Sequence, residues 1–107
     1  MAELVARTPL AGRRLDAGRI GMEAGPAGMD CGHVSIRIKG AGTLDLLGIA
    51  GIANGDSGRL FTRLAALRVE IEWLRTPDED ARIQVERFSA DYLWCWLAAK
   101  AEIQAAA

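Results

Sequence analysis

The sequence predicts a small α+β domain in which helices dominate: short N-terminal β-strands and a short helix packed on a C-terminal antiparallel helical hairpin. Three observations predict it. Residues 33–39 alternate apolar and polar side chains, as a half-buried strand does. Apolar residues between 60 and 74 recur at steps of four and three, the spacing of one helix face. Thr76-Pro77-Asp78-Glu79 carries the signature of a helix N-terminus.

Residues 1–30 are rich in glycine, and we predict that they are partly flexible. The glycines and two prolines allow only short regular structure. We expect at most a small hairpin there, in which Arg13–Leu15 pairs with Arg19–Glu23 around Asp16-Ala17-Gly18.

A strand over residues 33–39 follows, because Val34, Ile36 and Ile38 are β-branched and alternate with polar residues. We then expect a short helix over residues 43–53, capped by Thr43 and stopped at Asn54-Gly55.

The helical hairpin is predicted from residues 57–75 and 77–104. In the first helix the apolar face consists of Leu60, Leu64, Leu67, Ile71 and Leu74. Thr76 would cap the second helix, with Pro77 at its first position and Glu79 returning the capping bond. So short a connection would force the two helices to fold back on each other.

Two tryptophans point away from the predicted helix seam. The second helix outruns the first, and residues 92–97 are apolar all round. Something must therefore cover Trp73 and Trp94. Two interpretations stay open: the N-terminal strand and short helix pack on them as core, or they anchor an interface with another chain. The candidate interaction residues are Trp73, Trp94, Val69, Arg87 and Ala98.

Composition bounds the class of protein. The chain has 107 residues, half of them hydrophobic and a quarter charged, which indicates a single domain, 1–107, with its own core. A net charge of −1 gives no overall attraction to nucleic acid or membranes. The N-terminus does not resemble a secretory signal, and no apolar run approaches the roughly 20 residues that span a bilayer. We expect a cytoplasmic protein. The preference for Arg over Lys suggests a bacterial or phage accessory gene.

No group of residues specifies a reaction. Cys31-Gly32-His33 offers two metal ligands where zinc needs three or four. Gly40-Ala41-Gly42-Thr43 lacks the further glycines or lysine of a nucleotide-binding loop. The acids of Asp78-Glu79-Asp80 suit the first turn of a helix without any catalytic role. We therefore assign no catalytic residue, metal or cofactor, and an enzyme is the less favoured class.

One segment resembles a known family. Residues 67–74, with Arg87 and Lys100 downstream, are similar to the start of the all-helical chorismate mutases, where Arg and Lys on long helices bind a dicarboxylate. In that family the first helix continues without interruption, whereas Thr76-Pro77 ends it here. The sequence therefore indicates no family.

The function predicted is binding another protein, as an adaptor, an inhibitor or a homo-oligomer, with a homodimer expected. The alternative is a small enzyme or anion-binding domain with a pocket between sheet and hairpin, in which Arg68, Arg87 or His33 would bind the anion. An arm formed by Arg7, Arg13, Arg14 and Arg19 could bind nucleic acid, but no aromatic residue lies among them to stack on a base, so this is not expected.

Overall fold

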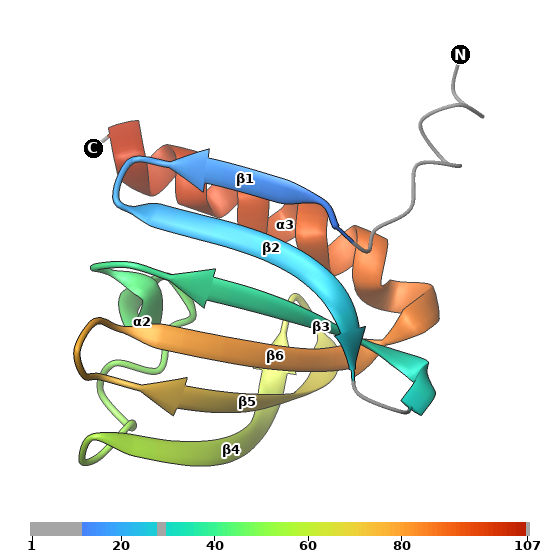
Figure 1. Ribbon diagram of the computed structural model, residues 1–107, viewed down its shortest axis with the longest axis horizontal. Helices are drawn as coiled ribbons and strands as arrows, with labels where there is room; N and C mark the ends of the chain where they lie inside the picture. Colours follow the sequence, from blue (N-terminus) through green and yellow to red (C-terminus); the bar gives the residue numbers. More distant parts are fainter. Residues whose placement is uncertain (1–11, 28–29, 107) are drawn as a thin grey trace.

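The structure, a computed structural model, describes residues 12–27 and 30–106 and contains one antiparallel sheet of six strands. The strands are β1 (Arg14–Ala17), β2 (Ile20–Ala27), β3 (Asp30–Lys39), β4 (Ser57–Leu64), β5 (Leu67–Leu74) and β6 (Asp80–Glu86). The helices are α2 (Thr43–Leu46) and α3 (Arg87–Ala106). In the sheet the order is β1-β2-β3-β6-β5-β4, which leaves β1 and β4 at the edges (Figure 1).

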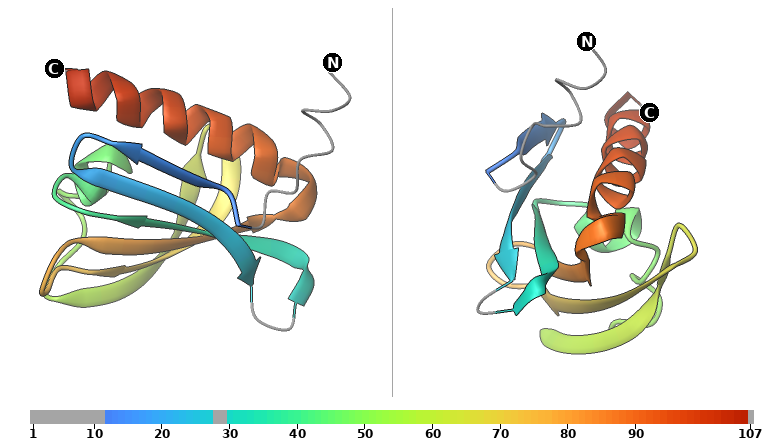
Figure 2. Two further views of the ribbon diagram at one scale, coloured as in Figure 1. Left: turned by 45° about the horizontal axis from the view of Figure 1, so that its top comes forward. Right: turned by 90° about the vertical axis from the view of Figure 1, so that its right-hand side faces the viewer.

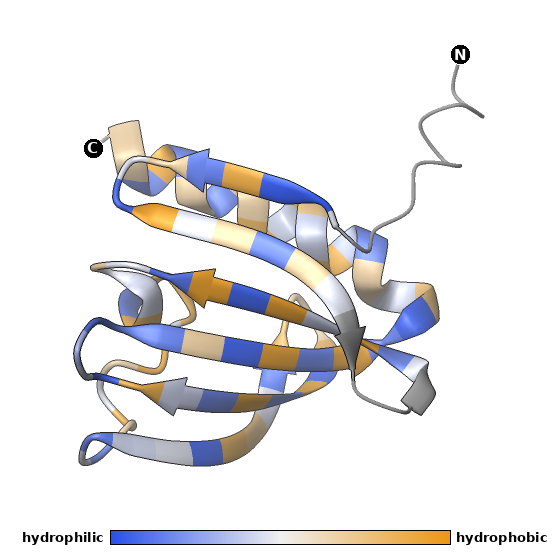
Figure 3. Cartoon of the chain, in the orientation of Figure 1, coloured by the Kyte–Doolittle hydropathy of each residue, from blue (hydrophilic) through white to orange (hydrophobic). Residues whose placement is uncertain are grey.

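The molecule has two layers. Helix α3 lies along one face of the sheet, and the opposite face is open (Figure 2). Hydrophobic and hydrophilic residues alternate along most strands, so one set faces the helix and the other faces solvent (Figure 3). At the centre, Ile36, Ile83 and Ile71 from three adjacent strands are fully buried together with Leu93 and Leu97 of α3. Burial of this shared apolar surface is what joins the layers.

The prediction of a helix over residues 57–75 is wrong, because these residues form the β4–β5 hairpin. Within a strand, residues four apart face the same side, as Leu60 and Leu64 do in β4 and Leu67 and Ile71 in β5. A two-residue turn between the strands adds a step of three. The same spacing therefore fits a helix face and a strand hairpin, and the fold class is dominated by the sheet rather than by helices.

The turn of this hairpin carries no sequence signal. Ala65 and Ala66 occupy it with φ values of 51° and 68°. Left-handed backbone at both central positions is typical of tight hairpin turns, but glycine, asparagine or aspartate usually supply it. With alanine at both positions, the segment looks like the interior of a helix.

The second predicted helix begins ten residues later than expected, at Arg87 rather than Pro77. Residues 80–86 form β6 between β3 and β5, and Ala81, Ile83 and Val85 face the core. The capping signature has another use. A Glu79 carboxylate oxygen accepts the Leu44 backbone N–H at 2.9 Å, so the acid caps α2 instead of its own segment. Residues 57–104 therefore form no helical hairpin, and the resemblance of residues 67–74 to a mutase helix fails with it.

Other predicted elements are present with different bounds. β3 contains the predicted strand 33–39, and β1 and β2 form the hairpin expected around Asp16-Ala17-Gly18. The short helix starts at Thr43 but ends at Leu46 rather than residue 53. The Thr43 hydroxyl does not cap it and donates to the Gly40 carbonyl at 2.7 Å. Residues 1–11, where flexibility was predicted, lie outside the described part of the chain.

Candidate functional site

The five predicted interaction residues do not form one surface. Trp73, Trp94 and Val69 are buried in the core, each tryptophan being only 5% exposed. Ala98 is half-buried, and Arg87 is exposed at the start of α3. Of the two interpretations of the tryptophans, the structure therefore supports core packing within this chain.

Each tryptophan ring also has an arginine guanidinium over its face. The Arg13 guanidinium carbon lies 5.9 Å from the Trp94 ring centre, and that of Arg75 lies 5.6 Å from the Trp73 ring centre. A cation over an aromatic face is favourable by about 0.5–1 kcal/mol at partly exposed positions. Gly58 completes the packing of Trp73, because a Cβ at Gly58 would lie 2.6 Å from the indole ring.

The open face of the sheet carries cross-strand ion pairs. Arg37 binds Asp80 through two hydrogen bonds, from Nε at 3.1 Å and from Nη2 at 2.7 Å. Hydrogen bonding to Asp80 and its negative charge raise the pKa of Arg37. At the far side of the sheet, Arg59 approaches Glu70 at 2.9 Å and Glu72 at 3.2 Å. At these two arginines, positive charge is neutralised locally.

In the described part of the chain, Arg63 and Arg68 lack such a partner, as does Arg82 of β6, which lies opposite Arg37 on the same face. Arg63 and Arg68 are direct partners in the β4–β5 register, so both side chains lie on the open face. Both are exposed, and within the described residues neither forms an ion pair or hydrogen bond. Like charges directly opposite each other in a sheet are destabilising. The pair is a concentration of positive charge that the fold leaves without a counter-ion.

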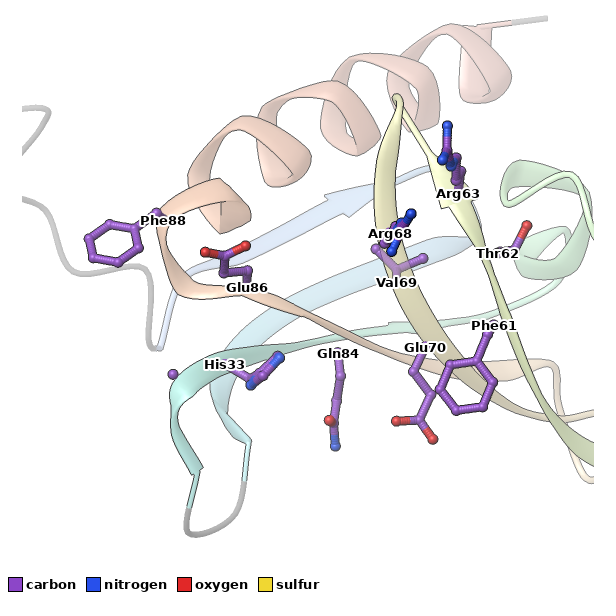
Figure 4. A pocket seen from close by; sticks show the side chains of 11 residues that line it. His33, Phe61, Thr62, Arg63, Arg68, Val69, Glu70, Gln84, Glu86 and Phe88 are labelled. Atoms are coloured by element: carbon purple, nitrogen blue, oxygen red, sulfur yellow. The ribbon is translucent and has the colours of Figure 1, made fainter.

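The two arginines line a wide groove of about 940 Å³. Figure 4 shows that Phe61, Arg63, Arg68 and Glu70 come from the β4–β5 hairpin. The other lining residues come from β3 and from the end of β6 where it enters α3, and they include His33, Gln84, Glu86 and Phe88. We call this feature the arginine groove.

Two aromatic rings stand at the groove and are nearly uncovered. Phe61 is 77% exposed and Phe88 is 90% exposed. Phenylalanine side chains are usually buried, and a pair of exposed ones beside a groove marks a binding surface more often than a random piece of exterior. The groove thus combines cations and apolar rings with the carboxylates of Glu70 and Glu86.

The chemistry available here is that of binding. A guanidinium binds carboxylate or phosphate through two parallel hydrogen bonds, and the phenylalanines supply apolar contact area. Elsewhere, Cys95 is an exposed free thiol on α3. Among the described residues, no three His, Cys, Asp or Glu side chains gather in a way that could hold a metal.

Sequence reasoning found only part of this site. Arg68 and His33 were named for an anion pocket, and both line the groove. Arg87, named with them, is not among its lining residues. Phe61, Arg63 and Phe88 were missed. The signal that would have found Arg63 is the strand alternation on both sides of Ala65-Ala66, which places Arg63 opposite Arg68 once the turn is recognised.

Comparisons with known proteins add no identity. No family model matches the chain, and neither the curated proteins nor the solved structures give a significant match. The fold and the groove define a two-layer α+β protein with an arginine-lined groove on its open sheet face. Neither helix of the described residues has the length and apolar character needed to cross a lipid bilayer.

Proposed function

We propose that this chain is a small protein-binding module and that the arginine groove binds an acidic, partly apolar segment of another protein. One observation carries the proposal. Arg63 and Arg68 face each other with no carboxylate partner, in a groove that is also lined by the exposed rings of Phe61 and Phe88. The expected location remains the cytoplasm.

Neither Arg63 nor Arg68 has a carboxylate partner within the described residues. Arg37 and Arg59 on the same face each have at least one, whereas Arg82 has none in the described part of the chain. A partner's carboxylate between Arg63 and Arg68 would relieve their repulsion and form charge-assisted hydrogen bonds. Such bonds are roughly twice as strong as neutral ones.

Phe61 and Phe88 supply the exposed apolar surface of the groove. Phenylalanine and arginine are both enriched in the buried centre of protein interfaces. A protein segment laid in the groove would cover the two rings, and the hydrophobic gain is about 25 cal/mol for each Å² removed from water. A small inorganic anion would leave both rings exposed.

The partner proposed here is another protein rather than a second copy. A homodimer anchored by Trp73 and Trp94 is not favoured, because both rings are buried within the chain.

A second candidate is a small anionic metabolite bound by the same groups. It is favoured by the presence of His33 with Arg63 and Arg68 around one groove. The two candidates differ in what they need, because a metabolite uses the arginines and His33, whereas a peptide also needs Phe61 and Phe88.

The test uses fluorescence anisotropy and two labelled synthetic peptides in which every second residue is Ser. At the positions between, the acidic peptide alternates Glu with Phe and the basic peptide alternates Lys with Phe, so that charge and ring share one face of an extended strand. We expect only the acidic peptide to bind. Arg63→Gln or Arg68→Gln should weaken binding about tenfold, which corresponds to about 1.4 kcal/mol. Arg19→Gln is the control, because Arg19 is exposed in the β1–β2 turn and lies outside the groove.

Four results would distinguish the two candidates. Equal binding of both peptides, or equal loss in all three variants, would overturn the proposal. A thermal shift with citrate or inorganic phosphate that Arg63→Gln abolishes, without peptide binding, would favour the metabolite instead. Loss of affinity in Phe61→Ala and Phe88→Ala would support the peptide.

A further inference from the structure

The outer edge of β4 is a second feature, separate from the arginine groove. β4 ends the sheet order, and no described strand pairs with its outer side (Figure 1). It is eight residues long, against four in β1 at the other edge. An open edge presents a row of N–H and C=O groups that can pair with another extended chain.

The register shows which residues present these groups. The Arg75 N–H donates to the Asp56 carbonyl at 2.8 Å just beyond the hairpin, and β4–β5 pairs continue this register without a shift. In an antiparallel pair, hydrogen-bonded positions alternate with positions whose backbone groups point away. Gly58, Leu60 and Thr62 therefore bond to β5. The N–H and C=O groups of Arg59, Phe61 and Arg63 point to the open edge.

The same three residues carry side chains on the open face. Arg59, Phe61 and Arg63 pair with Glu72, Glu70 and Arg68 respectively, and all of these lie opposite the helix layer. Arg59 is already held by Glu70 and Glu72, at 2.9 and 3.2 Å. Of the two arginines in β4, Arg63 is therefore the one that lacks a carboxylate partner.

We infer that the acidic segment of the partner adds to β4 as a seventh strand. This inference rests on the proposed function and specifies how the segment binds. The segment is extended, hydrogen-bonds to the backbone of Arg59, Phe61 and Arg63, and places a carboxylate beside Arg63 and Arg68. The residue next to that carboxylate on the same face, two positions along, lies beside Phe61 and is apolar.

The charges on β4 argue against a second copy as the added strand. Antiparallel self-pairing centred on Phe61 would place Arg59 of each copy opposite Arg63 of the other, twice. Like charges in direct opposition are destabilising, whereas Glu or Asp in those positions would be stabilising. Charge complementarity therefore selects an acidic strand.

The first test is amide hydrogen exchange of the wild-type protein, with and without the acidic peptide. The amides of Arg59, Phe61 and Arg63 should exchange quickly in the free protein and at least about tenfold more slowly in the complex. The amides of Leu60 and Thr62 are the internal control, because they already bond to β5. Protection elsewhere with none at Phe61 would overturn the inference.

The second test separates backbone from side chain at one position. Phe61→Pro removes the edge N–H and the ring, and Phe61→Ala removes only the ring. We expect Phe61→Pro to bind the peptide at least about tenfold more weakly than Phe61→Ala. Proline is tolerated at an edge position whose N–H faces solvent. If Phe61→Pro does not fold, the exchange measurement on the wild type still decides.

The outcomes distinguish this inference from the proposed function. If the acidic peptide binds, depends on Arg63 and Arg68, but leaves the edge amides unprotected, the groove binds its partner without strand addition. If no acidic peptide binds, the proposed function fails. If β4 pairs with a second copy, the protein becomes a dimer without peptide, and the inference about the acidic strand is wrong.

Discussion

Arg63 of β4 and Arg68 of β5 stand directly opposite each other at a position of the hairpin where no backbone hydrogen bonds join the pair. In such pairs the Cα atoms are only about 4.5 Å apart and the side chains approach closely. Two exposed guanidinium groups are thus held together without a carboxylate. Repulsion of this kind lowers stability unless something binds there, and it makes the pair the centre of the proposed site.

The first prediction follows from this repulsion. Arg68→Glu should raise the free energy of unfolding by about 0.5 kcal/mol, because it turns a like-charge pair into an ion pair with Arg63. Urea unfolding measures it, with Arg19→Glu as a control for the change in net charge. The same substitution should abolish binding of the acidic peptide. A destabilised Arg68→Glu would mean that Arg68 has a structural role not seen in the contacts.

The second prediction concerns the core. Trp94→Ala should lower the free energy of unfolding by about 3–5 kcal/mol, because the ring is 5% exposed and packs between α3 and the sheet. Phe88→Ala, on the same helix but with a ring that is 90% exposed, should change it by less than about 0.5 kcal/mol. Both values come from chemical denaturation. A folded, stable Trp94→Ala monomer would return Trp94 to the list of interface residues.

The third prediction concerns the close approach of two loops. Gly40 has a φ of 125°, and a Cβ there would lie 1.9 Å from the Arg19 carbonyl oxygen. Gly40→Ala should therefore destabilise the protein by at least about 2 kcal/mol. Gly51→Ala is the matched control, because nothing lies within 4 Å of a Cβ at that position. Similar melting temperatures for the two variants would contradict the packing of β2 against β3 described here.

The fourth prediction concerns the cap on α2. Glu79→Ala removes the acceptor of the Leu44 N–H and should cost about 1 kcal/mol of stability. Asp78→Ala changes the charge equally, but Asp78 is exposed and makes no such bond, so its effect should be smaller. Thermal unfolding of the two variants compares them. Equal losses would mean that the acids act through net charge rather than through the cap.

The sequence correctly predicted those elements whose residue pattern fits only one kind of secondary structure. Alternating β-branched residues identified β3, and the glycines at the turn identified the β1–β2 hairpin. The apolar residues after position 87 were correctly predicted to be helical. The failure lies between residues 57 and 86. There, Leu60, Leu64, Leu67 and Ile71 fit a helix and a hairpin equally well, and the Ala65-Ala66 turn lacks the residues that usually reveal one.

Long-range contacts explain the rest of the difference between the predicted and the observed structure. Glu79 serves a helix that begins 36 residues earlier, at Thr43, so a local capping pattern was satisfied by a distant donor. The candidate site has the same origin. Arg63, Arg68, His33 and Phe88 come from four elements, and only the strand order brings them to one groove. Periodicity within one segment contains no information about that order.

The most direct test of the proposed site is a titration with the acidic peptide, followed through the arginine Nε–H and backbone amide signals. We predict shifts at Arg63 and Arg68 and at the amides of Phe61 and Phe88, with Arg19 unchanged. Shifts confined to other arginines, such as Arg37, or no saturable shift at Arg63 and Arg68, would contradict the assignment of the arginine groove as a protein-binding surface.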